Sequence, residues 1–345
     1  MNAFLKIFLL TVALTIIASC SNEEMFIDRY KDNISFLFQT SNDTLKKISV
    51  SDNFVSEINL QNFSIGKIDV IKKFRGKFYL VSSASKKIFV LTENTYEIAE
   101  IDYSALNLVP IDICFPNATD AYVAHSNDSC VTIVDLTNNI ISSIRIPVSG
   151  YAGRIAGIGN QVHITIPEKN LVEIIDTRTN KVENILSVSA RPTFVEFIDD
   201  GTKSAVVSIG YGKKNNSAEE EVTSAKISII DAIDPKIESE LNIGGSNEIA
   251  IVPTSIAISP RFIYISAQNS STSTVWRLAT SNFRTMVSMS RNSSSFVGYS
   301  KTHNIVYSLE ETNRNQPQMT LFNGTTNARI SSIPFTHLPL VVIDE

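Results

Sequence analysis

The sequence predicts an all-β protein: a seven-bladed β-propeller of four-stranded antiparallel blades, with the ring closed by N-terminal and C-terminal strands in one blade. Three observations predict this fold. Short strands that alternate apolar and polar residues recur along the chain, they repeat at intervals typical of propeller blades, and each chain end supplies part of one blade. After the signal-like N-terminus, no long segment has the period of a helix.

The clearest unit spans residues 121–147 and reads AYVAHSNDSCVTIVDLTNNIISSIRIP. Its three alternating strands are separated by polar turns at Asn127-Asp128 and Asn138-Asn139. The middle strand has relatives throughout the chain, whose central apolar residues lie 40, 43, 41, 55, 47 and 45 positions apart: Val50, Val90, Ile133, Ile174, Ile229, Trp276 and Leu321. Two positions later, five of the seven copies carry Asp or Asn, whose side chains bond to the backbone and start turns.

Each unit also contains an earlier strand pair, which brings the number of strands per unit to four. One such sheet cannot bury both faces alone, whereas blades stacked around an axis bury them all. PLVVIDE at the C-terminus is a first strand without a successor, and NISFLFQ at 33–39 is a second strand without a predecessor, so pairing them closes a ring of seven blades. The longest interval is explained by a polar insertion at 210–222, GYGKKNNSAEEEV, between the second and third strands of one blade.

The N-terminus predicts export and a lipid anchor. Lys6 precedes an apolar run, Ile7 to Ile17, that is too short to span a bilayer and is typical of a signal peptide. The run ends in Ile17-Ala18-Ser19-Cys20, which resembles the bacterial lipobox. In that family the signal is cut before the cysteine, and the cysteine is acylated. The predicted organisation is therefore a lipoprotein signal peptide at 1–19, lipidated Cys20 with a tether at 20–33, and the propeller at 34–345.

The same segment predicts a location in the cell envelope, periplasmic or facing the surface. An ordinary secretory signal with an incidental cysteine, or an N-terminal anchor helix, are the alternatives. Ser21, rather than Asp, follows the cysteine, which favours the outer membrane in a Gram-negative host. Glu23 and Glu24 either resemble the surface-export signals of some Bacteroidota lipoproteins or belong to a solvated tether. Several palmitate-type acyl chains on one cysteine anchor a protein stably, so the membrane is a predicted partner.

Composition excludes some classes of function. Without residues 1–19, which contain one basic residue, Lys6, the chain has 29 basic and 35 acidic residues, and no basic stripe indicates nucleic-acid binding. Cys114 and Cys130 lie two predicted strands apart, so we expect core thiols rather than a disulfide. The four histidines show no metal-type spacing, and no motif for a cofactor is present, so no metal and no cofactor are predicted.

Two stretches resemble the YVTN-repeat propellers of bacterial extracytoplasmic proteins. They are DAYVAHSNDSCVTIVDLTNNIISSIRIP, beginning at Asp120, and LVEIIDTRTNKVENILSVSARPTFVEFIDDGTKSAVVS, beginning at Leu171. The resemblance covers about residues 34–345 and is weak near 270–300. It implies a seven-bladed propeller but no single activity, because relatives include binding lipoproteins, cell-surface proteins and, more distantly, lactonases. Some surface-lipoprotein relatives partner outer-membrane transporters in vitamin B12 uptake, which makes a transporter a possible partner by analogy.

The predicted ligand site is the opening of the ring. In up-and-down blades, the loops leading into first strands and the loops joining second to third strands share one face. Six residues of these loops are the candidates for ligand binding: Lys67, Tyr151, Arg154, Arg191, His337 and His125. The same face should also carry Pro110, Thr254, Asn127, Glu168, Tyr211, Gln268, Asn269 and Glu310. Lys67, Arg154 and Arg191 could together hold an anionic group, unless the arginines are solvated or paired with acids such as Glu168.

These features predict a binding or scaffold protein rather than an enzyme. Its partner would be a small anionic ligand at the axial opening or a neighbouring envelope protein. The alternative is a hydrolase like the propeller lactonases, in which His125, His337 and the arginines act on a ring ester. A cluster of acid, His and Arg at the axis would favour the hydrolase, and a plugged opening would favour a scaffold.

Overall fold

The computed structural model describes most of the predicted propeller. The described residues are 34–41, 44–51, 55–60, 63–198, 201–210, 223–243, 251–268, 273–289, 293–311, 316–336, 339 and 341–344. The predicted signal peptide at 1–19, the predicted lipidated Cys20 with its tether at 20–33, and the candidate residue His337 lie outside the described residues.

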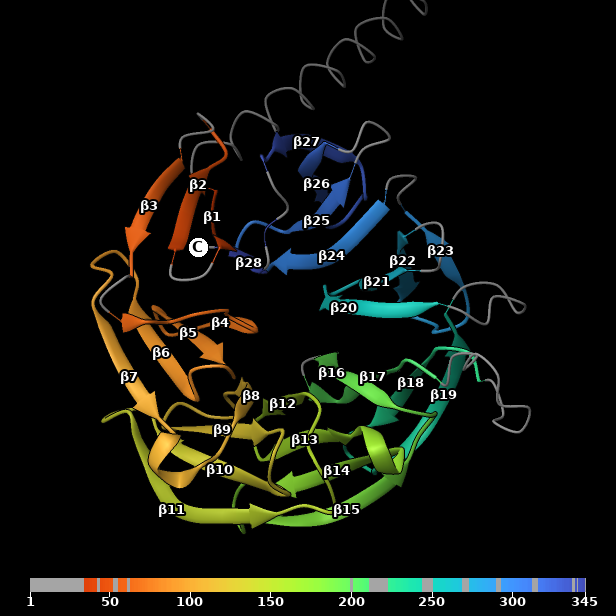
Figure 1. Cartoon of the computed structure of the whole chain (residues 1–345). Helices are drawn as coiled ribbons and strands as arrows, with labels where there is room; N and C mark the ends of the chain where they lie inside the picture. Colours follow the sequence, from red (N-terminus) through yellow and green to blue (C-terminus); the bar gives the residue numbers. More distant parts are fainter. Residues whose placement is uncertain are drawn as a thin grey trace, which may run out of the picture.

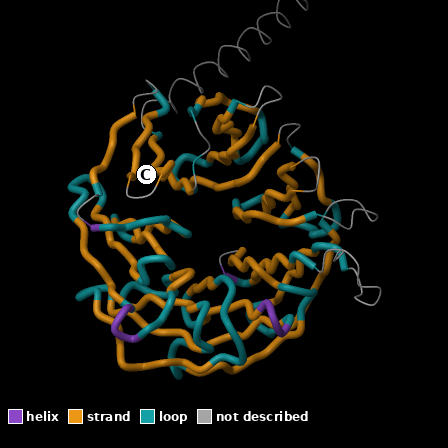
Figure 2. Tube along the Cα trace, in the orientation of Figure 1, coloured by secondary structure: helices purple, strands orange, loops and turns teal. Residues whose placement is uncertain are grey.

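Seven four-stranded antiparallel sheets form a ring, which confirms the predicted seven-bladed propeller (Figure 1). Strand is by far the commonest element of the described residues, and short 3-10 helices, among them η2 (Ser104–Leu106) and η3 (Pro167–Lys169), lie between strands (Figure 2). Each blade has one innermost strand beside the axis. These strands are β28 (Val341–Asp344), β4 (Val70–Phe74), β8 (Pro110–Cys114), β12 (Ile155–Ile158), β16 (Pro192–Ile198), β20 (Val252–Ile258) and β24 (Ser293–Ser300).

The other strands of each blade follow outward in chain order, and the blades are numbered here from the one that contains the N-terminal strand. Blade 1 adds β1 (Ser35–Ser41), β2 (Thr44–Ser49) and β3 (Val55–Asn59); blade 2 adds β5 (Lys77–Ser82), β6 (Lys87–Thr92) and β7 (Ile98–Asp102); blade 3 adds β9 (Asp120–His125), β10 (Cys130–Asp135) and β11 (Ile140–Pro147); blade 4 adds β13 (Gln161–Ile166), β14 (Leu171–Asp176) and β15 (Lys181–Ser187). Blade 5 adds β17 (Lys203–Ser208), β18 (Lys226–Asp231) and β19 (Lys236–Asn242); blade 6 adds β21 (Phe262–Gln268), β22 (Ser273–Ala279) and β23 (Met286–Ser288); blade 7 adds β25 (Ile305–Glu311), β26 (Pro317–Asn323) and β27 (Arg329–Pro334).

The turn after the third strand forms as the Asp and Asn positions predict in blades 3, 4, 5 and 7. Asp135 Oδ1 accepts a hydrogen bond of 2.8 Å from the Thr137 N–H. The equivalent contact after β18 joins Asp231 Oδ1 and the Ile233 N–H at 2.8 Å. These contacts reverse the chain into the outermost strand without a glycine. The long polar insertion predicted in blade 5 falls between β17 and β18 as expected, and its residues 211–222 are outside the described residues.

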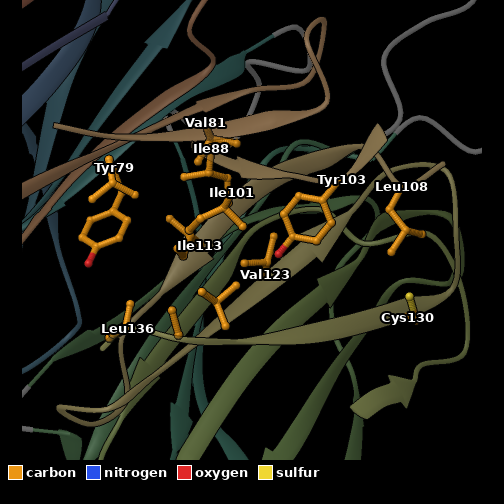
Figure 3. Close-up of a cluster of buried hydrophobic side chains, with 13 residues drawn as sticks. Tyr79, Val81, Ile88, Ile101, Tyr103, Leu108, Ile113, Val123, Cys130 and Leu136 are labelled. Atoms are coloured by element: carbon orange, nitrogen blue, oxygen red, sulfur yellow. The ribbon is translucent and has the colours of Figure 1, made fainter. Parts of the chain in front are cut away.

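The core lies between neighbouring blades. Figure 3 shows one such layer, in which side chains of blade 2, including Tyr79 and Val81, face side chains of blade 3, including Ile113 and Val123. All four of these side chains are at most 1% exposed. Each large apolar side chain buried in this way stabilises the fold by roughly 1.5–3 kcal/mol, so stacking of blades supplies the main driving force.

The two chain ends close the ring as predicted. Strand β28 pairs antiparallel with β1, with Phe38 opposite Val342 and Leu37 opposite Ile343. Blade 1 is then joined to blade 7 by aromatic packing, since the ring of Phe36 meets the ring of Tyr307 edge-on at 4.9 Å between centroids. Closure therefore rests on both ladder hydrogen bonds and core packing.

Cys114 and Cys130 are free thiols buried in the core, as predicted. Burial raises the pKa of the Cys130 thiol to about 11, so it stays protonated near neutral pH. Within the described ranges, no helix has the length and apolar character that crossing a membrane would require.

Phe36→Ala should lower the free energy of unfolding by about 3–5 kcal/mol, because it leaves a cavity where the closing blade meets blade 7. Val55→Ala on β3 is the control, since Val55 is 43% exposed in the outermost strand of the same blade. The free energy of unfolding of this control variant should stay within about 0.5 kcal/mol of the value for the parent protein. Urea unfolding measures the free energy of unfolding of both variants. If Phe36→Ala lowered it no more than Val55→Ala does, the closing blade would contribute little to stability.

Candidate functional site

A cavity of about 490 Å³ lies on the axis of the ring. The innermost strands and the segments beside them line it, with the following residues: Asp69, Val70, Ile71, Lys72, Asp112, Arg154, Phe194, Val195, Glu196, Thr254, Ser255, Ile256, Ser295, Phe296, Leu309, Pro339 and Val342. Blades 2 to 5 contribute every charged residue of this set. Blades 6, 7 and 1 contribute apolar and hydroxyl-bearing residues, so the cavity has a charged wall and a mainly apolar wall.

Strand periodicity explains which of the lining residues can turn their side chains toward the axis. Successive side chains of a strand point to opposite faces, so every second residue of an innermost strand can face the axis. In β16, Phe194 and Glu196 line the cavity as half-buried side chains, and Val195 between them is 1% exposed. In β20 the half-buried Thr254 and Ile256 flank Ser255, whose hydroxyl turns away and accepts a hydrogen bond of 2.8 Å from the Val297 N–H of blade 7.

Lys72 and Asp112 form an ion pair that connects three blades. Lys72 Nζ lies 3.0 Å from Asp112 Oδ1, and it also donates to the Ile155 carbonyl at 3.3 Å. Asp112 accepts two backbone hydrogen bonds, from Ile113 N–H at 2.9 Å and from Ile155 N–H at 3.1 Å. Burial by itself would lower the pKa of Lys72, but the carboxylates of Asp112 and Glu196 outweigh it and the pKa is raised. Lys72 is therefore a fixed cation.

Arg154 enters the cavity from the residue just before β12. Its backbone N–H donates to Thr165 Oγ1 at 2.9 Å, and its guanidinium Nη1 donates to the Ile111 carbonyl at 2.8 Å. The preceding residue is Gly153, where a Cβ would clash with Thr165 Oγ1. The close packing of Gly153 against Thr165 fixes the backbone of Arg154. The planar guanidinium has further N–H donors besides the one that bonds to the Ile111 carbonyl.

Glu196 is the acidic residue of the cavity whose carboxylate has no hydrogen-bonding partner among the described residues. No hydrogen bond joins its carboxylate to another residue within the described parts of the chain. Burial raises the pKa of the Glu196 carboxyl above its usual range, and the charges of Lys72 and Arg154 act in the opposite direction. The charges of both cations therefore act on the Glu196 carboxylate, while its oxygens can still accept hydrogen bonds from a ligand.

The structure brings only part of the predicted cationic cluster to the cavity. Arg154 lines it, and so does Thr254. Lys67 is exposed in the loop before β4 and is outside the cavity lining. Arg191 is also exposed and outside the lining; its backbone has a φ of 56° and its N–H donates to Asn170 Oδ1 at 2.9 Å. Tyr151 is 51% exposed, and its backbone N–H donates to Glu168 Oε1 at 3.1 Å.

His125 does not face the opening as expected, because its side chain is fully buried inside blade 3. Its Nε2 lies 2.9 Å from Thr132 Oγ1, which is 3.1 Å from the Tyr103 hydroxyl, and the Tyr103 ring meets the imidazole edge-on at 4.9 Å. His163 is also a core histidine, fully buried, with Nδ1 2.9 Å from Ser204 Oγ. None of the histidines within the described residues lines the axial cavity.

Sequence reasoning missed Lys72, Asp112 and Glu196. It assigned the site to the loops, whereas most of the charged side chains lie within the innermost strands themselves. A signal was present, since each of the three is a charged residue inside a largely apolar first strand, in VIKKF, PIDIC and PTFVEFI. A charge at such a position requires a partner or a solvated cavity, because burying it alone is costly.

Comparison with known proteins finds similar folds at low sequence identity. No family model matches the chain, and no curated protein does. A provisionally assigned 6-phosphogluconolactonase from Bacteroides uniformis is 10% identical with a TM-score of 0.66, over 91% of this chain and 100% of that chain. A protein from Lactobacillus plantarum is also 10% identical with a TM-score of 0.66, over 90% and 99% of the two chains. The periplasmic gluconolactonase of Pseudomonas aeruginosa is 9% identical with a TM-score of 0.64, over 90% and 98%. These likenesses show the shared propeller fold alone.

The two core histidines should make the protein less stable in acid. Burial lowers the pKa of His125 to about 4 and that of His163 to about 3, from 6.5 in the unfolded chain. Below pH 6.5 the unfolded state binds protons that the folded state does not, so the free energy of unfolding should fall as the pH decreases toward 4. The loss should be about 3 kcal/mol for His125.

Urea unfolding at several pH values between 7 and 4 measures this dependence. His163→Gln should show a shallower decrease than the parent protein, because one of the two proton-binding differences is removed. If the free energy of unfolding decreased equally steeply with pH in both proteins, His163 would not contribute to the loss of stability in acid.

Proposed function

We propose that the protein is a lipid-anchored envelope propeller that binds a small polar ligand in its axial cavity. The observation that carries this proposal is the pairing of a charged wall with an apolar wall around a space of about 490 Å³. Small-molecule sites commonly enclose about 300–1,000 Å³ and combine apolar surface with a few placed polar groups. The cavity meets both conditions.

Arg154 is the residue that would take an anionic group of the ligand. Its backbone and one of its guanidinium nitrogens are already held, and its remaining donors suit a carboxylate or phosphate. Lys67 and Arg191 belong to the rim at most, since they are exposed and outside the cavity lining. An envelope protein docked over the opening would be a different partner, and the ligand-capture experiment below separates the two.

The anchor belongs to the same proposal. The lipobox-like Ile17-Ala18-Ser19-Cys20 supports acylation of Cys20, and Ser21 supports sorting to the outer membrane. Each buried CH₂ of an acyl chain contributes about 0.8 kcal/mol to membrane binding, so several chains hold a protein stably. The tether at 20–33 would then leave the propeller free to meet its ligand beside the membrane.

A ring-ester hydrolase is the second candidate function. The observation that favours it is the raised pKa of the Glu196 carboxyl beside Lys72 and Arg154, since a carboxyl group with a raised pKa suits proton transfer. Two of the similar folds also carry gluconolactonase names. The roles once expected for His125 do not fit, because that side chain lies in the core of blade 3. Binding is therefore the function that the geometry favours.

Arg154→Gln should abolish capture of the ligand, whereas Arg191→Gln should leave it intact. The full-length protein in detergent micelles is incubated with a small-molecule extract of the cells that produce it, and mass spectrometry identifies what the protein retains. Glutamine keeps much of the side-chain length but removes the charge and most of the donors. Retention of the same molecules by both variants would rule out the axial cavity as the site.

The same samples separate binding from hydrolysis and from protein docking. If the retained molecule is released chemically unchanged, the protein is a binding protein. If its ring-opened product accumulates with the parent protein and not with Arg154→Gln, the hydrolase is the correct function. Co-purification of an envelope protein that survives Arg154→Gln, with no retained small molecule, would favour a scaffold.

Cys20→Ser should release the protein from the membrane. Serine cannot form the thioether to the lipid, so the acyl chains and their hydrophobic anchoring energy are lost. Labelled palmitate should be incorporated into the parent protein and not into the variant, and fractionation should move the variant to the soluble pool. A variant that stays in the membrane fraction would point to the uncleaved N-terminal apolar segment as the anchor.

A further inference from the structure

The charged groups of the axial cavity divide into those that already have partners and those that do not. Lys72 and Asp112 bond to each other at 3.0 Å, and each oxygen of Asp112 also accepts a backbone hydrogen bond, from blade 3 at one oxygen and from blade 4 at the other. Asp69 Oδ2 accepts a hydrogen bond of 2.8 Å from the Ser83 N–H. These three residues form the frame of the site, because each of them already makes a contact that holds strands or blades together.

Arg154 and Glu196 keep capacity for a ligand. Only one hydrogen bond of the Arg154 guanidinium is present among the described residues, the one to the Ile111 carbonyl. The Glu196 carboxylate makes none within the same residues. The two side chains come from the neighbouring blades 4 and 5, and the charge of Arg154 lowers the pKa that burial raises at Glu196, so they lie within electrostatic range of each other. The cavity thus presents one donor fork and one acceptor pair on neighbouring blades of the same lining.

The balance of charge selects the ligand class. The described residues that line the cavity include two cations, Lys72 and Arg154, and three carboxylates, Asp69, Asp112 and Glu196. A purely anionic ligand would add a further negative charge beside Glu196, and like charges repel each other. A purely cationic ligand would satisfy Glu196 and be repelled by Arg154. A molecule with one charge of each sign matches both groups and adds no net charge.

The opposite wall requires an apolar body. Phe296, Ile256 and Val342 lie across the cavity from the charged wall, and Phe194 lies two residues from Glu196 on the same strand. Apolar groups buried there would contribute roughly 25 cal/mol for each Å² removed from water. A strongly hydrated body such as a polyphosphate would lose its hydration at this wall without compensation.

From this juxtaposition we infer that the ligand is a small zwitterion of the α-amino-acid type with an apolar side chain. Its carboxylate binds the Arg154 guanidinium, its ammonium binds the Glu196 carboxylate, and its side chain lies against Phe296 and Phe194. The inference rests on the proposed ligand binding in the axial cavity and specifies which class of molecule the cavity takes.

Isothermal titration calorimetry of the full-length protein in detergent micelles tests the inference with defined probes. The probes are L-phenylalanine and L-leucine, together with 3-phenylpropanoate, which lacks the ammonium, and 2-phenylethylamine, which lacks the carboxylate. At least one amino acid should bind, and 3-phenylpropanoate and 2-phenylethylamine should each bind about tenfold or more weakly than L-phenylalanine if that is the amino acid bound, since each loses one charge-assisted contact.

Two variants assign the contacts. Glu196→Gln should weaken amino-acid binding about tenfold or more, because the ammonium contact is lost, and should not weaken 3-phenylpropanoate binding, because that probe has no ammonium and the change removes a like charge beside it. Arg154→Gln should weaken amino-acid binding similarly and should not weaken 2-phenylethylamine binding, for the corresponding reason. Glu57→Gln is the matched control, since Glu57 lies on the outermost strand of blade 1 and pairs with Lys46 at 2.9 Å, away from the cavity lining. Unfolding curves of all variants identify any that fail to fold.

Three results would overturn the inference. They are binding of neither amino acid, binding of 3-phenylpropanoate as tight as that of L-phenylalanine, and a folded Glu196→Gln variant with unchanged amino-acid affinity. In each case the ligand-capture experiment with Arg154→Gln still decides the proposed function separately. Arg154-dependent capture of a molecule without an ammonium group would keep the binding function and reject the zwitterion.

Discussion

A four-stranded antiparallel sheet with two apolar faces cannot be stable alone, and this constraint shapes the whole molecule. Each blade must be covered on both sides by a neighbour, so the sheets form a ring and the ring must close. Closure by β28 against β1 leaves every blade with two neighbours. The same arrangement places one innermost strand of each blade beside the axis (Figure 1). Side chains from seven separated parts of the chain therefore converge there.

Convergence at the axis creates a second problem, because charged side chains on these strands are removed from bulk water. The structure resolves it with the ion pair of Lys72 and Asp112, which also bonds to the backbone of Ile155. Three consecutive blades are thereby connected through polar contacts as well as through their apolar cores. Asymmetry follows, since the equivalent strands of blades 6, 7 and 1 carry apolar and hydroxyl-bearing residues instead.

This asymmetry is more informative about function than the fold is. Propellers about 10% identical to this chain share its architecture, and architecture alone does not specify chemistry at such distance. The distinguishing feature is local: Arg154 and Glu196, close enough for their charges to interact, opposite a wall that contains Phe296. Such a cavity suits recognition of a molecule by both charge and shape, with the histidines of the described residues serving the core rather than the site.

The sequence by itself determined the blade number, the strand order and the joining of the two ends, because strand alternation and the Asp or Asn turns are local properties that repeat along the chain. It also placed Arg154 at the axial opening and the two thiols in the core. Only the tertiary structure decided which charges meet at the axis. Lys72 of blade 2 pairs with Asp112 of blade 3, and Arg154 of blade 4 donates to the Ile111 carbonyl of blade 3; no local pattern encodes contacts between residues so far apart in the sequence. For the same reason, Lys67 and Arg191 occupied suitable loops in the sequence, yet their side chains lie at the surface, outside the lining of the cavity.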